Sequence, residues 1–232
     1  MIRSAVILAA GRGKRQRPFT DKTPKPLLAV RGRATLDYLL IAVHRAGVEQ
    51  VCIVTHHLED QIFDFVGDGS RWGLGVTFAH QPEQRGSGDA LLSVPRLWTG
   101  SDSFMVLAAD YILEESALVP LVEAHEQLRA DITMSLKACS VAELTRRSNA
   151  VLDDHWRVKQ IIEKPSPDQI ASPYAASMLF IFPPDIWHYL PRIQLSVRGE
   201  IELQSAVQAM IEDGYRAYGV LQPAPEEWRP GR

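Results

Sequence analysis

The chain has 232 residues, of which 46% are hydrophobic and 23% are charged, and its formal net charge is −3 at pH 7. This length suffices for one well-buried α/β domain, and the composition is typical of a soluble globular protein. The slightly negative charge gives no general attraction to nucleic acid or to anionic membranes, so phosphate binding would need local basic groups. The apolar run at residues 5–10 is too short for a signal peptide or a membrane helix. We therefore expect a cytoplasmic protein without nucleic-acid or membrane partners.

Two cysteines occur, Cys52 and Cys139, and both lie in apolar, strand-like runs. We interpret them as buried core thiols and not as a disulfide or metal-binding pair. That usage fits a reducing compartment.

Strand-like and helix-like patterns alternate through the first half of the chain. Buried strands are expected at residues 5–8, 51–54, 76–78 and 104–107. Helices are expected between them, at residues 35–46, 60–66 and 89–97. Such a pattern is typical of a parallel sheet that is covered on both faces. Ligands bind beyond the carboxyl ends of the strands in these sheets, so residues 11–17 and Asp110 should share one crevice.

After about residue 130 the pattern becomes more mixed. Strands are expected at residues 131–137 and 178–182, a hairpin turn at residues 153–156, and a helix at residues 202–212. No internal repeat and no obvious linker interrupts the sequence. The expected organisation is a single domain over residues 1–232.

The strongest motif follows the first predicted strand and reads Leu8-Ala9-Ala10-Gly11-Arg12-Gly13-Lys14-Arg15. Two glycines just past a strand let backbone N–H groups surround phosphate oxygens without obstruction by side chains. Basic side chains add positive charge at the same place, namely Arg12, Lys14, Arg15 and Arg17. Further on, Pro24 and Pro26 stiffen the segment that presents Lys25. These features predict a phosphate-binding loop.

Other glycine-loop motifs fit this segment less well. A P-loop needs a Lys-Ser or Lys-Thr pair that closes a longer glycine-bracketed loop, and no such pair follows. The dinucleotide-binding fingerprint needs a third small residue, where this chain has Gln16. A dinucleotide-binding oxidoreductase is therefore a distant alternative.

With these motifs the chain resembles the sugar-1-phosphate nucleotidyltransferases, the family that includes the glucose-1-phosphate thymidylyl- and uridylyltransferases. Later motifs carry the resemblance almost to the C-terminus: Gly67-Asp68-Gly69-Ser70, residues 81–88, Asp110, Glu163-Lys164-Pro165 and Gly199-Glu200. The resemblance implies an α/β fold of three α/β/α layers, Rossmann-like (GT-A-like), around a mixed, mainly parallel sheet. It also implies a nucleotide-binding half at about residues 1–130 and a sugar-phosphate-binding half at about residues 131–232.

The activity that the resemblance implies is Mg²⁺-dependent transfer of a nucleotidyl group from UTP or dTTP to a sugar 1-phosphate, with release of pyrophosphate. Gly11 and Gly13 would hold the triphosphate, and Arg15 would neutralise the departing pyrophosphate. Lys25 would contact the transferring phosphoryl group. Asp110 would bind Mg²⁺, because this cation prefers carboxylate and phosphate oxygens. The resemblance also allows a homo-oligomer.

For the base, the resemblance implies that Gln81 reads its edge while Gly86 leaves room for the ring. A glutamine offers a donor and an acceptor, as the O4/N3–H edge of uracil or thymine requires, which favours UTP or dTTP over ATP or GTP. The full nucleotide-binding set is Leu8, Ala10, Gly11, Gly13, Gln81, Gly86 and Ser87.

On the acceptor side, the resemblance implies that Glu163 accepts hydrogen bonds from sugar hydroxyls and that Lys164 pairs with the sugar phosphate. Asn149 and Glu200 complete the expected sugar-phosphate site. Two other local features are given ordinary interpretations. The pair Arg146-Arg147 is interpreted as solvated, and the adjacent histidines at positions 56 and 57 are interpreted as loop or core residues.

The sequence departs from the family pattern at several places. Pro230 stands where the family has a second metal-binding Asp, within Trp228-Arg229-Pro230-Gly231-Arg232. On the sugar side, Met178 stands where a Gly is usual and Ser205 where an Asp is common. We interpret these departures as an unusual acceptor or a weakened enzyme. The alternative function is a catalytically reduced regulatory module that still binds a nucleotide or sugar phosphate.

Overall fold

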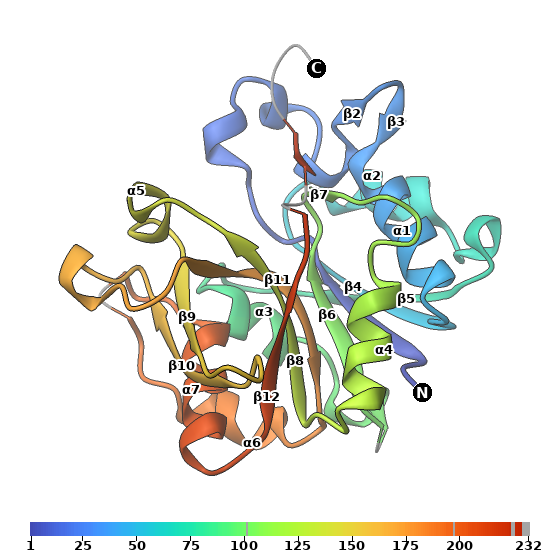
Figure 1. Ribbon diagram of the computed structural model, residues 1–232. Coiled ribbons are helices and arrows are strands. Elements are labelled where there is room, and N and C mark those ends of the chain that lie inside the picture. The colour runs from blue at the N-terminus through green and yellow to red at the C-terminus, as the bar shows by residue number, and fades with distance from the viewer. Residues whose placement is uncertain (101, 197, 224–225, 229–232) are drawn as a thin grey trace.

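The structure, a computed structural model, describes residues 1–100, 102–196, 198–223 and 226–228 (Figure 1). Its centre is a nine-stranded mixed sheet. The strands of the first half are parallel: β1 (Ser4–Leu8) lies between β4 (Gln50–Thr55) and β6 (Phe104–Ala108), and β5 (Gly75–His80) lies outside β4. The carboxyl ends of these strands therefore lie at one edge of the sheet.

The strands of the second half join this sheet through β11 (Tyr174–Phe182), which runs antiparallel to β6. Along one side of β11 lies β8 (Ile132–Ala138), which pairs in parallel with β12 (Ala217–Leu221). Along its other side, β11 pairs first with β9 (Ser148–Leu152) and then with β6. The last strand, β10 (Val158–Glu163), forms a hairpin with β9.

Helices cover both faces of the sheet, because side chains along each strand alternate between two separate apolar cores. One core includes Ile7 of β1. Apolar side chains of three helices pack into it: α1 (Thr35–Arg45), α2 (Glu59–Val66) and the N-terminal end of α4 (Val119–Gln127). The other core includes Val6. It buries α3 (Ser87–Leu92), α6 (Ile186–Tyr189) and α7 (Leu203–Glu212). The three-layer α/β expectation is confirmed.

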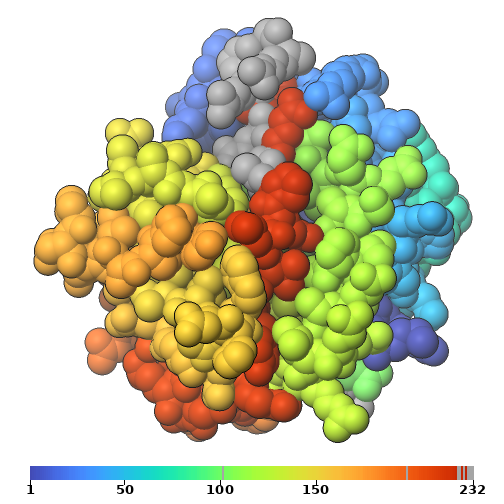
Figure 2. Space-filling model, in the orientation of Figure 1, coloured from blue at the N-terminus to red at the C-terminus, as the bar shows by residue number. Residues whose placement is uncertain are grey.

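Segments far apart in the sequence lie side by side on one face of the molecule. In Figure 2 the C-terminal segment that contains β12 lies between the segment around α4 and the segments of β9 and β10. A short helix, α5 (Val141–Leu144), follows β8. Short 3₁₀ helices lie at Lys14–Gln16, Phe19–Asp21, Lys25–Leu27, Ser70–Trp72, Arg96–Thr99, Pro167–Gln169 and Leu190–Arg192.

Two small sheets lie beyond the carboxyl edge of the main sheet. One pairs β2 (Ala29–Val30) with β3 (Arg33–Ala34), and the other pairs β7 (Tyr111–Ile112) with β13 (Glu226–Glu227). They are joined by a third apolar cluster that consists of Leu28, Val30, Ile112 and Trp228. The indole nitrogen of Trp228 donates to the carbonyl of Ala29 at 3.2 Å. Trp228 thus packs beside the strand that follows Asp110.

Several expectations need correction. The helix expected at residues 89–97 begins at Ser87 and ends at Leu92, because Pro95 lacks an N–H group and restricts the residue before it. The strand expected at residues 178–182 is only the end of β11. Helix α4 and strand β12 were not anticipated. Across the described ranges, no helix combines the length and the apolar character that a membrane crossing needs.

The two cysteines have different environments. Cys52 lies buried in β4, and burial raises the pKa of its thiol to about 11. Cys139 lies just after β8 and is only half-buried, so the expectation of a core thiol in a strand holds for Cys52 alone. Both are free.

Candidate functional site

A cleft of about 970 Å³ opens at the carboxyl ends of β1 and β6. It brings together the glycine loop, the Lys25 segment, the loop at residues 81–86 (expected to read the base edge, and called the base-edge loop below) and the end of β6. The expected site residues that line it are Leu8, Ala10, Gly11, Gly13, Arg15, Lys25, Gln81, Gly86, Ser87, Asp110 and Glu200. The shared crevice expected for the glycine loop and Asp110 is therefore present.

The glycine loop needs glycine at position 13. Gly13 has φ +61°, and a Cβ atom there would lie 2.7 Å from Cγ2 of Thr20 and 3.3 Å from Cβ of Lys25. Thr20 is buried, and its hydroxyl donates to the carbonyl of Gly13 at 2.9 Å. The loop is therefore held closely against the segment that carries Lys25, with its backbone open to the cleft.

Lys25 and Asp110 form an ion pair at the centre of the cleft. They are 85 residues apart in the sequence, and their side chains are 19% and 27% exposed. Lys25, which lies between two prolines, begins a 3₁₀ helix, while Asp110 is the second residue after the end of β6. The side chains of Arg12, Lys14 and Arg15 line the same cleft. The positive charges exceed the negative ones here, as the binding of a triphosphate requires.

The donor set at Asp110 is compatible with Mg²⁺ bound by one carboxylate, phosphate oxygens and water. Within the described ranges, no three His, Cys, Asp or Glu side chains gather into a metal-binding cluster. Pro230, at the position of the family's second carboxylate, lies outside the described residues. Asp110 is thus the carboxylate of this cleft that could hold the metal next to Lys25.

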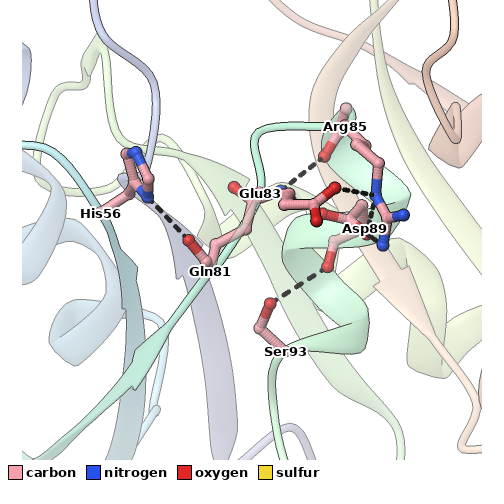
Figure 3. Close-up of polar contacts among 7 residues, drawn as sticks. His56, Gln81, Glu83, Arg85, Asp89 and Ser93 are labelled. Carbon is pink, nitrogen blue, oxygen red and sulfur yellow. Dashed lines mark hydrogen bonds and ion pairs between the residues drawn. The ribbon is translucent and has the colours of Figure 1, made fainter.

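The base-edge loop is fixed on both sides. Gln81 is buried, its N–H donates to Thr55, and its carbonyl accepts a hydrogen bond of 2.8 Å from Nδ1 of His56 (Figure 3). Gly86 has φ +101°, and a Cβ atom there would lie 2.6 Å from the carbonyl oxygen of Ile201. The backbone of this loop therefore packs tightly against the segment that leads into α7.

On the acceptor side, three carboxylates surround one guanidinium. Nη2 of Arg198 lies 3.8 Å from Glu163 and 3.1 Å from Glu200, and it also contacts Glu202. Burial, together with the charges of Glu202 and Glu200, raises the pKa of Glu163 to about 7. Burial also raises the pKa of Glu202. The cluster thus has one guanidinium for three carboxyl groups, whose oxygens are hydrogen-bond acceptors.

Three expected acceptor residues do not line the cleft. Asn149 is fully buried, and its amide bonds the backbone of residues 171–174 at distances from 2.9 to 3.1 Å. Lys164 is exposed and has φ +47°, and its N–H donates to the carbonyl of Arg147 at 2.8 Å. Glu163 does not line the cleft. It lies 3.8 Å from Arg198, which also contacts Glu200, a residue of the cleft.

The cleft also contains residues that sequence reasoning missed. Arg146 and Arg147, which follow α5, both line it, while Arg146 is exposed and Arg147 is half-buried, as a solvated pair would be. Met178, already noted in the sequence as a departure on the sugar side, lines the cleft as well, and its N–H donates to the hydroxyl of Tyr111 at 3.0 Å. The capping-box pattern Ser140-x-x-Glu143 could have indicated the helix that positions the arginines.

The chain matches the family model described as nucleotidyl transferase over residues 4–229. It belongs to this family. It is 31% identical over 210 residues to the UTP–glucose-1-phosphate uridylyltransferase AglF of Haloferax volcanii, covering 90% of this chain and 84% of that protein. It is also 31% identical over 211 residues to the low-salt glycan biosynthesis nucleotidyltransferase Agl11 of the same organism. The resemblance to the sugar-1-phosphate nucleotidyltransferases is thereby confirmed.

The fold agrees with that of solved relatives in the family. A UDP-glucose pyrophosphorylase complexed with UDP-glucose superposes with a TM-score of 0.85 at 20% sequence identity, covering 98% of this chain and 93% of that chain. The match with Agl11 includes 90% of this chain but only 57% of the length of Agl11.

Proposed function

We propose that the protein transfers a nucleotidyl group from UTP or dTTP to a sugar 1-phosphate and releases pyrophosphate, with Mg²⁺ as its cofactor. The observation that carries this proposal is the cleft itself, which places the glycine loop, the Lys25–Asp110 ion pair and Gln81 around one space. The family membership and the name of AglF support the same reaction.

In the proposed reaction, an oxygen of the sugar phosphate forms a bond to the α-phosphorus of the nucleotide. The bond between this phosphorus and the oxygen that bridges to the β-phosphate breaks, and pyrophosphate leaves. Such transfer depends on positioning and charge stabilisation and needs no covalent nucleophile.

The residues of the phosphate side supply that positioning and charge. Backbone N–H groups at Gly11 and Gly13 hold the β- and γ-phosphates, and Arg15 neutralises the charge that develops on pyrophosphate. Lys25 exchanges its contact with Asp110 for one with the α-phosphoryl oxygens. Mg²⁺ at Asp110 supplies further charge neutralisation when it is bound.

The base side supports a pyrimidine nucleotide. Gln81 and Gly86 both line the cleft, so Gln81 would meet the edge of a base that binds there. Uracil and thymine present the same O4 and N3–H groups to Gln81, so the proposal includes both UTP and dTTP as substrates. On the acceptor side, Glu200 lines the cleft and would accept hydrogen bonds from sugar hydroxyls.

A second candidate function is a binding module that holds the nucleotide without transferring it. Pro230 in place of the expected second carboxylate favours this candidate, as does Met178 in the cleft where relatives have a glycine. Mg²⁺ bound by one carboxylate would then be insufficient for turnover.

Pyrophosphate release separates the two candidates. Four nucleoside triphosphates are crossed with a panel of sugar 1-phosphates in the presence of Mg²⁺, and binding of each triphosphate is measured in parallel. The proposal predicts release with UTP or dTTP and at least a 10²-fold slower rate for Asp110→Asn. Asp154→Asn, in the exposed turn between β9 and β10, is the matched control and should match wild type. Binding of UTP or dTTP without release with any acceptor would refute the enzyme and leave the binding module.

A further inference from the structure

Gln81 is held through both of its backbone polar groups. Its N–H donates to the carbonyl of Thr55 at 2.9 Å. Its own carbonyl oxygen lies 2.8 Å from Nδ1 of His56 (Figure 3). Because a carbonyl oxygen only accepts, this ring nitrogen of His56 carries the proton and donates it. The residue therefore cannot shift along the loop without losing two hydrogen bonds.

The side-chain amide of Gln81 is held in one orientation. Its nitrogen lies 2.8 Å from Oδ2 of Asp89, with a longer contact of 3.4 Å to the carbonyl of Gly86. A carboxylate only accepts hydrogen bonds, so the amide must turn its NH₂ group, and not its oxygen, toward Asp89. Among the residues that the structure describes, no group donates to the amide oxygen, and Gln81 lines the cleft.

Asp89 is itself fixed by a second partner. Its side chain is 9% exposed, and its Oδ1 accepts hydrogen bonds from Nη2 of Arg85 at 3.1 Å and from Nε at 3.3 Å (Figure 3). One carboxylate oxygen therefore faces Arg85, and the other faces the amide of Gln81. Rotation of the carboxylate would only exchange two equivalent acceptors, so Asp89 presents an acceptor to Gln81 in either case.

We infer that Asp89 is a positioning residue that acts through Gln81 and makes the cleft select bases with an N–H donor at the edge that is read. This inference rests on the proposed function. The amide oxygen of Gln81 accepts from N3–H of uracil or thymine, whereas N3 of cytosine is itself an acceptor. A flip of the amide would place its oxygen against the carboxylate of Asp89, so the site cannot adapt to cytosine. Two facing acceptors leave a desolvated polar group unpaired, which is the strongest basis for rejection of a ligand.

The variant Asp89→Asn tests this inference, because asparagine has the same shape and can both donate and accept. The asparagine oxygen still accepts from Arg85, so its NH₂ group faces Gln81 and the amide of Gln81 turns over. We expect the ratio of kcat/KM for UTP to that for CTP to fall by about 10-fold or more. The ratio of the dissociation constant for CTP to that for UTP should fall by a similar factor, which gives a readout that does not need turnover. If the deoxynucleotide is the better substrate, dTTP and dCTP replace this pair.

Two further variants make the result specific. In Ser93→Ala the lost hydroxyl donates to the backbone carbonyl of Asp89 at 3.2 Å and does not touch its carboxylate, so the ratio should match wild type. In the double variant Gln81→Glu with Asp89→Asn, the asparagine NH₂ donates to the glutamate. The other glutamate oxygen still accepts from the base, and the net charge is unchanged, so the selectivity lost in the single variant should return.

The possible outcomes separate the inference from the function on which it rests. A cooperatively folded Asp89→Asn protein that keeps the wild-type ratio within twofold overturns the inference alone. If Asp89→Asn does not fold, the double variant provides the test. A wild-type ratio of kcat/KM for UTP to that for CTP supports the inference, and a ratio near one overturns it. Wild-type protein that binds no pyrimidine triphosphate overturns the proposed function and, with it, the inference.

Discussion

The carboxylate cluster around Arg198 makes the stability of the protein depend on pH through Glu163. The pKa of Glu163 is raised from an ordinary 4.5 to about 7, first by burial and then by the neighbouring charge of Glu202. Between these two pH values the folded protein holds a proton on Glu163 that the unfolded chain releases. The free energy of unfolding therefore falls as the pH rises through this window.

The size of the effect follows from the pKa. A difference of one pKa unit corresponds to about 1.4 kcal/mol, so an increase from 4.5 to about 7 corresponds to about 3 kcal/mol at pH values above 7. The side chain of Glu163 is 22% exposed, and solvent reduces this amount. We therefore expect the ionised carboxylate to destabilise the fold by about 2 kcal/mol.

Urea denaturation of Glu163→Gln at pH 5 and pH 8 measures this effect. The neutral amide avoids the ionisation, so the variant should be about 2 kcal/mol more stable than wild type at pH 8. At pH 5 the two proteins should differ by less than about 1 kcal/mol. Glu123→Gln, on the exposed face of α4, is the control and should follow wild type at both pH values. A Glu163→Gln protein whose stability difference from wild type does not change with pH would refute the reasoning.

Three other predictions concern the glycine loop, the C-terminal cluster and the buried thiol. Gly13→Ala should lower the free energy of unfolding by about 3 kcal/mol, because its φ is positive and the added Cβ atom would lie 2.7 Å from Cγ2 of Thr20; a loss below about 1 kcal/mol in urea denaturation would exclude the steric argument. Trp228→Ala should lower the free energy of unfolding by about 3 kcal/mol, whereas Trp156→Ala, at a residue that is 39% exposed, should lower it by less than about 1 kcal/mol. The reverse order in urea denaturation would mean that the cluster at Trp228 does not stabilise the fold. Cys52 should stay unmodified when the folded protein is treated with iodoacetamide at pH 8, because burial raises its pKa to about 11; a mass adduct on this residue would contradict its burial.

The side of the cleft that carries the glycine loop was largely predictable, because its signals are local. A glycine pair after the first strand and an aspartate after the fourth both lie at strand ends, and the ends of parallel strands meet at one edge. The ion pair of Lys25 with Asp110 does not follow from that rule, because Lys25 lies in a 3₁₀ helix well past the end of β1. The partner of Gln81 did not follow, because Asp89 has the same spacing as any acidic residue in the first turn of a helix.

The acceptor side was less predictable, because its geometry depends on long-range strand pairing. The resemblance implies that Asn149 belongs to the sugar-phosphate site, but pairing of β9 with β11 buries its amide against residues 171–174. The charge of Arg146 and Arg147 is visible in the sequence, whereas their direction is set by the turn from α5 into β9. Residues whose role depends on antiparallel pairing leave no local pattern.

The central claim is that this cleft joins a nucleotide to a sugar phosphate, and the identity of the product tests it most directly. The protein is incubated with UTP or dTTP, Mg²⁺ and a mixture of sugar 1-phosphates. The products are then separated and identified by mass spectrometry. The proposed function predicts a nucleotide sugar and pyrophosphate in equal amounts, with the mass of the sugar identifying the acceptor. Bound nucleotide that is recovered unchanged, or hydrolysed without incorporation of a sugar, would contradict it.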